Sequence, residues 1–248
     1  MQKLNTKERF VAFIDILGFK NLVENYSHEF VFNKLNTIVN SIIELEKIFK
    51  DKRKQWIKTW IFSDSIMLVS IDDSEYSADV MLLLSANVVA KALQQELLVK
   101  GAIAFGEFTA DYKKSIFFGK PLIDAFQLEE EMKVSGIILH HSFERKLKEM
   151  KYKDVNLLAD GRSFDYLTPM KFGTVKHLHL NWLEYAKNAK DEKGESISFE
   201  KCKRLIERIY FEVSGQPRIY IDNTLILLSK SNEIITSPIN TNLPKTKS

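Results

Sequence analysis

The stretch Phe10-Val11-Ala12-Phe13-Ile14-Asp15-Ile16 decides the fold class of this chain. It is a short, almost continuous apolar run with β-branched and aromatic side chains, the pattern of a strand buried on both faces. A single carboxylate, Asp15, interrupts the run at its end, and Leu17-Gly18-Phe19 then predicts a turn. An unpaired charge at the exit of a buried strand is costly, so Asp15 needs a partner, and a cation would supply one.

Outward from this strand, the sequence alternates between helical and strand patterns up to about residue 140. The patterns predict, in order, a helix over residues 30–49, strands over 55–61 and 66–71, a helix from Asp72 or Ser74 to about 98, strands over 99–108 and 115–118, a helix over 120–132 and a strand over 136–139. The order strand, helix, helix, hairpin, helix, hairpin, helix, strand indicates an α+β sandwich with helices packed on a mainly antiparallel sheet. The helix that begins near Ser74 is apolar on most of its circumference, so we expect it to be buried, within the fold or against a second subunit.

The pattern weakens after about residue 140. Helices are predicted near residues 142–149, 181–189 and 198–213. The sequence therefore divides into a core of residues 1–140 and a C-terminal helical extension of residues 141–248.

Composition excludes several function classes. The 248 residues include 36 Lys+Arg and 33 Asp+Glu, a formal net charge of +3 that is too small to predict binding to nucleic acid or to a membrane surface. The longest apolar stretches are shorter than the roughly 18 residues of a membrane-spanning helix. The only cysteine, Cys202, fits a reducing compartment. We therefore expect a cytoplasmic protein with no membrane or nucleic-acid partner.

A second carboxylate is a candidate partner for the first. Asp64 lies at the tip of the predicted hairpin, in Phe62-Ser63-Asp64-Ser65, and a compact sandwich would bring Asp15 and Asp64 together. Two neighbouring carboxylates repel unless a divalent metal or a proton lies between them. The alternative is that Asp64 satisfies turn amides and Asp15 caps the helix after Gly18. The residues alone leave both interpretations open.

Four segments resemble the class III nucleotidyl cyclases. Phe13-Ile14-Asp15-Ile16-Leu17-Gly18-Phe19 is similar to the family's opening signature, phenylalanine-x-Asp-Ile-x-Gly-Phe, and Ser63-Asp64 stands where the family has a Gly-Asp hairpin. Lys100-Gly101-Ala102-Ile103-Ala104-Phe105-Gly106-Glu107 is similar to its strand with a basic residue, Gly-Ile and Gly-Glu. Phe118-Gly119, followed by a helix that ends in Leu128-Glu129, is similar to its last core element. The likeness covers about residues 8–140 in the family's order.

The resemblance implies a ferredoxin-like catalytic core, a nucleoside triphosphate substrate and two divalent cations, Mn²⁺ or Mg²⁺. The residues it assigns to the metals are Asp15, Ile16 and Asp64, and the backbone amides it assigns to the triphosphate are those of Ile16, Leu17, Gly18 and Phe19. Lys100 or Lys58 is the candidate cation for the transition state. The resemblance further implies a homodimer with sites at the interface.

Two departures from the purine enzymes bear on the base. Trp60 replaces the family's base-recognising lysine, and strand parity places Trp56, Lys58, Trp60 and Asp64 on one face, where bulky indoles would favour a smaller base. Core packing is the alternative role for these tryptophans. Ile123 and Gln127 stand where the purine enzymes carry an Asn and an Arg.

With Ser63-Asp64, these departures resemble the pyrimidine cyclases of the bacterial anti-phage Pycsar systems more than adenylate or guanylate cyclases. This resemblance implies conversion of CTP or UTP to 3′,5′-cyclic CMP or cyclic UMP plus pyrophosphate, with a product that acts on a separate effector. A purine cyclase with unusual base recognition and a degenerate cyclase domain that binds nucleotide without turnover are the alternatives.

Overall fold

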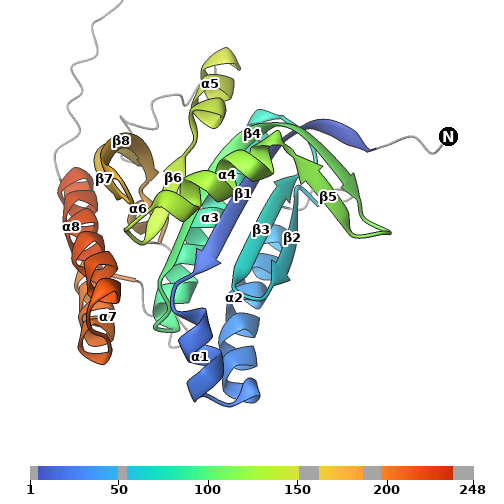
Figure 1. Cartoon of the computed structure of the whole chain (residues 1–248). Helices are drawn as coiled ribbons and strands as arrows, with labels where there is room; N and C mark the ends of the chain where they lie inside the picture. The colour runs from blue at the N-terminus through green and yellow to red at the C-terminus, as the bar shows by residue number, and fades with distance from the viewer. Residues whose placement is uncertain (1–4, 50–54, 151–161, 187–196, 237–248) are drawn as a thin grey trace, which may run out of the picture.

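The computed structural model describes residues 5–49, 55–150, 162–186 and 197–236. Figure 1 shows its elements, which in chain order are β1 (Thr6–Ile16), α1 (Phe19–Asn25), α2 (His28–Ile48), β2 (Ile57–Phe62), β3 (Ser65–Ser70), α3 (Glu75–Gln94), β4 (Val99–Asp111), β5 (Ile116–Gly119), α4 (Lys120–Glu131), β6 (Gly136–Leu139), α5 (His141–Glu149), β7 (Ser163–Met170), β8 (Gly173–Leu180), α6 (Trp182–Ala186), α7 (Phe199–Glu212) and α8 (Gln216–Thr236). Up to β6, the order is the one that the sequence predicts.

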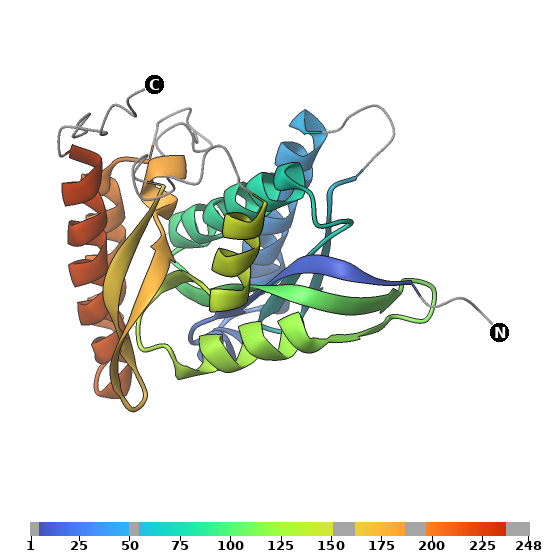
Figure 2. The same cartoon turned by 90° about the horizontal axis from the view of Figure 1, so that it is seen from above.

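The described strands form one eight-stranded sheet in the order β2-β3-β1-β4-β6-β8-β7, with β5 paired to β4. Strand β1 is antiparallel to both of its neighbours, β3 and β4, while β6 is parallel to β4. Helices α2 and α3 cover one face of the sheet and α4 covers the other (Figures 1 and 2). The predicted α+β architecture with a mainly antiparallel sheet is therefore confirmed.

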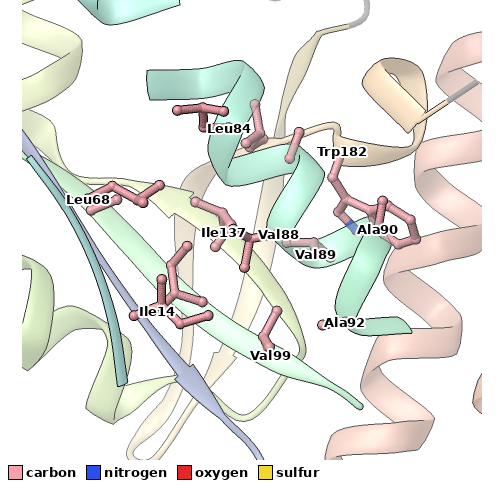
Figure 3. Packing of buried hydrophobic residues seen from close by; sticks show 14 of the residues in the cluster. Ile14, Leu68, Leu84, Val88, Val89, Ala90, Ala92, Val99, Ile137 and Trp182 are labelled. Atoms are coloured by element: carbon pink, nitrogen blue, oxygen red, sulfur yellow. The ribbon is translucent and has the colours of Figure 1, made fainter. Parts of the chain in front are cut away.

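Strand β1 is buried on both faces because its two sets of alternating side chains meet different layers. Phe10, Ala12, Ile14 and Ile16 belong to the large cluster beneath α2 and α3. On the other face, Val11 and Phe13 pack in the clusters near α4. Figure 3 shows the side chains of Ile14, Leu68 and Ile137, which extend from the sheet toward α3. Asp15 continues the α4-side series, and this position determines the layer in which the functional site lies.

Helix α3 is the central helix of the larger cluster. The Ser74 side chain accepts a hydrogen bond from the Ser77 amide and caps its first turn. By length and composition alone α3 is apolar enough to span a membrane, but 78% of its most apolar window is buried inside the fold. It packs against the sheet, α2 and α6, where Trp182 lies beside Ala90 (Figure 3). These contacts account for its apolar surface without a second subunit.

The C-terminal extension contains strands as well as the predicted helices. Helices α5, α6 and α7 match predicted segments, although the end of the helix predicted to reach residue 189 lies outside the described residues. The hairpin β7–β8 and helix α8 were not predicted. Strand β8 pairs with β6, so the extension continues the sheet of the core. Helix α8 is anchored where the Ser135 amide donates to Thr224 Oγ1 at 2.9 Å.

The close approach of β1 and β4 requires a glycine at position 101. A Cβ there would lie 2.7 Å from the backbone oxygen of Phe13 and 2.9 Å from side-chain atoms of Ile14 and Ile137. We expect Gly101→Ala to lower the free energy of unfolding by about 1–3 kcal/mol, because the strands must separate to admit the methyl group. Urea denaturation measures this, with Lys7→Ala at an exposed position of the same strand pair as the control. Equal stability of Gly101→Ala and the parent protein would contradict the close packing.

Candidate active site

The end of β1 and the tip of the β2–β3 hairpin lie side by side. The Ile16 amide donates to the backbone oxygen of Asp64 at 2.9 Å, and Asp15 is paired with Ser65 in the β1–β3 register. The hairpin turns within two residues, since Phe62 pairs with Ser65, and Ser63 adopts a positive φ of 56° to make this turn. This tight turn places Asp64 close enough to Asp15 for the charge of Asp64 to act on the Asp15 carboxyl group.

The electrostatic environment of Asp15 disfavours its ionised form. The pKa of Asp15 is raised from 3.8 to about 7, chiefly by burial and then by the negative charges of Glu129 and Asp64, against a smaller opposing effect of Lys100. Neutralisation by a cation or a proton would relieve this repulsion. A divalent cation fits the pair, because carboxylate oxygens are the ligands that Mg²⁺ and Mn²⁺ prefer.

Lys100 is the cross-strand neighbour of Asp15 on β4 and forms a buried ion pair with Glu129 of α4. Lys100 Nζ lies 2.7 Å from Glu129 Oε1 and donates to the Glu129 backbone oxygen at 3.0 Å. The side chains are only 9% and 4% exposed. Burial raises the pKa of Glu129, against the opposing hydrogen bond and charge of Lys100. Lys100, the predicted catalytic lysine, therefore lies beside Asp15, but its ammonium group is paired with Glu129.

Sequence reasoning quoted Glu129 only as the end of a motif and missed its place in the site. A signal was present, because Pro121, Ala125 and Glu129 recur at a spacing of four and all three are buried on the inner face of α4. A carboxylate at a core position of a helix implies a buried cation, and Lys100 is that cation.

The turn after β1 offers fewer amides to a phosphate than the resemblance implies. The amides of Ile16 and Leu17 donate to the backbone oxygens of Asp64 and Leu98, both at 2.9 Å. They close the ends of the β1 ladders and are unavailable to a ligand. Gly18 adopts a left-handed conformation with φ 75° and begins α1, which leaves the amides of Gly18 and Phe19 to donate to a phosphate.

The three residues predicted to line the base site lie on two faces of the sheet. Trp60 packs on the α4 side, stacked on Tyr112 with ring centroids 5.8 Å apart and in contact with Phe117 at 4.5 Å. Lys58 Nζ lies on the same side, 6.0 Å from the Tyr112 ring centroid. Trp56 instead packs against Tyr76 of α3, with ring centroids 4.5 Å apart.

The prediction that Trp56 shares the face of Lys58 and Trp60 is therefore wrong. Trp56 precedes β2, and both it and the next residue, Ile57, belong to the cluster beneath α2 and α3. Strict alternation begins only inside the strand, so parity counted from Trp56 places its side chain on the wrong face.

Helix α4 presents a partly apolar outer face beside the site. Ile123 is 55% exposed and Phe126 is 44% exposed, while Gln127 is also exposed. Phe126 meets Phe13 edge to face, with ring centroids 5.3 Å apart. The two positions that depart from the purine enzymes, Ile123 and Gln127, thus face outward from the protomer rather than into its core.

A cavity of about 570 Å³ opens on the other side of the turn. Leu17, Gly18, Leu98, Val213 and Tyr220 are among its lining residues, so it lies between the turn after β1 and helices α7 and α8. Asp15 and Asp64 do not line it, although Gly18, whose amide is available to a phosphate, does.

Comparisons with known proteins show the fold. No protein-family model and no curated protein sequence matches the chain. Among solved structures, the catalytic core of a rhodopsin-guanylyl cyclase with converted specificity, in complex with ATPαS, is similar with a TM-score of 0.52 and 15% identity over 72% of this chain and 98% of that one. A bacterial light-regulated adenylyl cyclase is similar with a TM-score of 0.50 and 12% identity over 82% of this chain and 98% of that one. The chain therefore has the fold of class III cyclase catalytic domains.

The raised pKa of Asp15 predicts a pH-dependent cost in the metal-free protein. A carboxyl group whose pKa is about 7 when folded and near 3.8 when unfolded binds more protons in the folded state, so stability falls as the pH rises from about 4 to 7. Asp15→Asn removes this cost. We expect the variant to be more stable than the parent protein by about 1–3 kcal/mol at pH 8, with the difference vanishing near pH 4.

Urea denaturation in EDTA at both pH values measures this difference. Asp111→Asn is the matched control, because Asp111 lies at the end of β4, far along the strand from Lys100, and accepts hydrogen bonds from the amides of Lys113 and Lys114. A variant with the same pH dependence as the parent protein would show that Asp15 is not the buried, repelled group described here.

Proposed function

We propose that this protein is a metal-dependent nucleotide cyclase that acts on CTP or UTP. The observation that carries the proposal is the juxtaposition of Asp15 and Asp64 at the end of the central strand, on a cyclase fold. The reaction is attack of the ribose 3′-hydroxyl oxygen on the α-phosphorus. The bond from the α-phosphorus to the bridging oxygen breaks, pyrophosphate leaves, and the hydroxyl proton is released.

The donor set fits two divalent cations, Mn²⁺ or Mg²⁺. Asp15, Asp64 and the backbone oxygen of Ile16 would hold them. Among the described residues no group of three His, Cys, Asp or Glu side chains could bind a metal ion. The remaining ligands would therefore be water and substrate phosphates, as is usual for Mg²⁺ in nucleotide sites. When bound, the cations supply Lewis-acid activation of the 3′-hydroxyl and neutralise phosphate charge.

The chain's own groups would position the triphosphate. The amides of Gly18 and Phe19 would donate to phosphate oxygens beside the carboxylates. Lys58, the other candidate cation, lies away from the two carboxylates, because it pairs with Val69 rather than near Ser65 on β3 and its Nζ donates to Gln55 Oε1. Lys100 is held by Glu129, and we assign it a role through Asp15 rather than through the substrate.

Base selection is assigned to Trp60. Its indole packs against Tyr112 and Phe117, and in this assignment it would take up the volume that a purine's second ring needs. Trp56 no longer belongs to this assignment, since it packs under α3. A purine cyclase is the second candidate function, because both similar structures are named as guanylyl or adenylyl cyclases.

We further propose that the active form is a homodimer with its sites at the interface. The α4 side carries exposed apolar side chains at Phe62, Ile123 and Phe126, which a second copy would cover. From the resemblance to the pyrimidine cyclases, we propose that the protein signals in anti-phage defence and delivers its cyclic nucleotide to a separate effector. From its single cysteine, Cys202, we propose that it is cytoplasmic.

Incubation of the purified protein with ATP, GTP, CTP and UTP in Mn²⁺ tests the reaction, with products identified by mass spectrometry. We expect cyclic CMP or cyclic UMP, and a loss of at least about 100-fold in Asp64→Ala, because this variant removes one of the two carboxylates that would hold the metals. A cyclic purine product would replace the pyrimidine assignment by the second candidate. Nucleotide binding without any product would identify a degenerate cyclase domain.

The variants Trp60→Ala and Trp56→Ala together test which residue selects the base. We expect Trp60→Ala to raise the rate with purine triphosphates relative to pyrimidine triphosphates by about 10-fold or more, because it opens the base site. Trp56→Ala removes an equal volume from the opposite face of the sheet and should leave this ratio unchanged. Equal ratios in the two variants would remove Trp60 from the base site.

A further inference from the structure

Lys100 has two anionic neighbours but contacts only one of them. Lys100 and Asp15 are directly opposed in the β1–β4 register and face the same α4 layer. Directly opposed residues on one face of an antiparallel pair have Cβ atoms about 4.5–5.5 Å apart, well within the reach of a lysine. Yet the structure places Lys100 Nζ on Glu129, through both a carboxylate oxygen and the backbone oxygen.

The pairing of Lys100 with Glu129 rather than with Asp15 affects how much negative charge is available to a metal ion. The negative charges of Glu129 and Asp64 both act on Asp15, and the positive charge of Lys100 opposes them. When Lys100 is paired with Glu129, these two charges cancel, and the two aspartates keep both negative charges for the cations. If Lys100 turned to Asp15, the ammonium group would occupy the position of a cation and neutralise a metal ligand.

We propose that Glu129 is a positioning residue that holds Lys100 away from Asp15 and thereby keeps the Asp15 carboxylate available to a divalent cation. The inference rests on the proposed function, because it assumes that Asp15 and Asp64 bind metal. Glu129 acts here through Lys100 and does not contact the reacting atoms. Partners behind metal ligands commonly change metal affinity by 10- to 100-fold when they are altered.

The experiment is a Mn²⁺ titration of the full chain without nucleotide, followed by electron paramagnetic resonance of free Mn²⁺. Glu129→Gln should weaken Mn²⁺ binding by about 10- to 100-fold, because it leaves an uncompensated lysine beside Asp15. Lys100→Met should bind Mn²⁺ at least as tightly as the parent protein, since it removes the competing cation. The double variant Glu129→Gln/Lys100→Met should return to within about threefold of the parent affinity, since the two aspartates again stand alone.

The opposite signs separate positioning from a merely structural role. If the ion pair only stabilised the fold, breaking it from either side would weaken Mn²⁺ binding, because either single variant strands a buried charge. Glu130→Gln is the matched control, since Glu130 is the next residue of α4 and forms an exposed pair with Lys171 at 3.0 Å. It should leave the affinity unchanged.

The outcomes also distinguish this inference from the proposed function. Binding of Mn²⁺ by the parent protein, lost in Asp64→Asn, supports the metal site itself. Parent-like affinity in Glu129→Gln, or weakened binding in Lys100→Met, would overturn the positioning role and leave the metal site standing. No Mn²⁺ binding by the parent protein would overturn both. If Glu129→Gln does not fold, the affinities of Lys100→Met and of the double variant still decide the matter.

Discussion

The pairing of β1 along both edges and its burial on both faces govern the rest of the structure. Every other layer is placed relative to this strand: β3 and β4 through hydrogen bonds, α2 and α3 through one set of alternating side chains, and α4 through the other. A strand held in this way has no freedom to slip, because a shift of one residue would exchange its two faces. The position of Asp15 is therefore fixed by the hydrophobic residues that precede it. The closely packed residues in the middle of β1 thus hold the Asp15 carboxyl group in a fixed position at the end of the strand.

Much of the core could be predicted from the sequence because its patterns are local. The apolar run of β1, the short hairpin around Ser63-Asp64 and the cap at Ser74 each lie within a few residues, and each has one favourable structure. The same is true of the two aspartates, whose meeting follows from two adjacent central strands. The face of Trp56 could not be derived in this way, because alternation fails where a strand begins.

The elements that were missed depend on tertiary contacts. Strand β7 contains Pro169, and β8 exposes Thr174, Val175 and Lys176, so neither has the continuous apolar run of a core strand. Helix α8 is rich in β-branched and polar residues with low helix propensity, and it is stabilised by packing and by the contact between Ser135 and Thr224. The Lys100–Glu129 pair joins a strand to a helix 29 residues later, and only the fold reveals which buried carboxylate meets which buried cation.

Because β6 pairs with β8, the folding unit of this protein extends beyond residue 140. Ile138 and Leu139 are fully buried and pair with His179 and Leu178, so a boundary at residue 140 would cut through a continuous sheet. A shortened chain ending there would expose the backbone edge of β6 together with apolar surface, and such an edge is a template for aggregation. Aggregation of such a shortened chain would therefore reflect the exposed edge of β6 and would not test the catalytic role of any residue. The C-terminal strands thus complete the sheet whose centre carries the two aspartates.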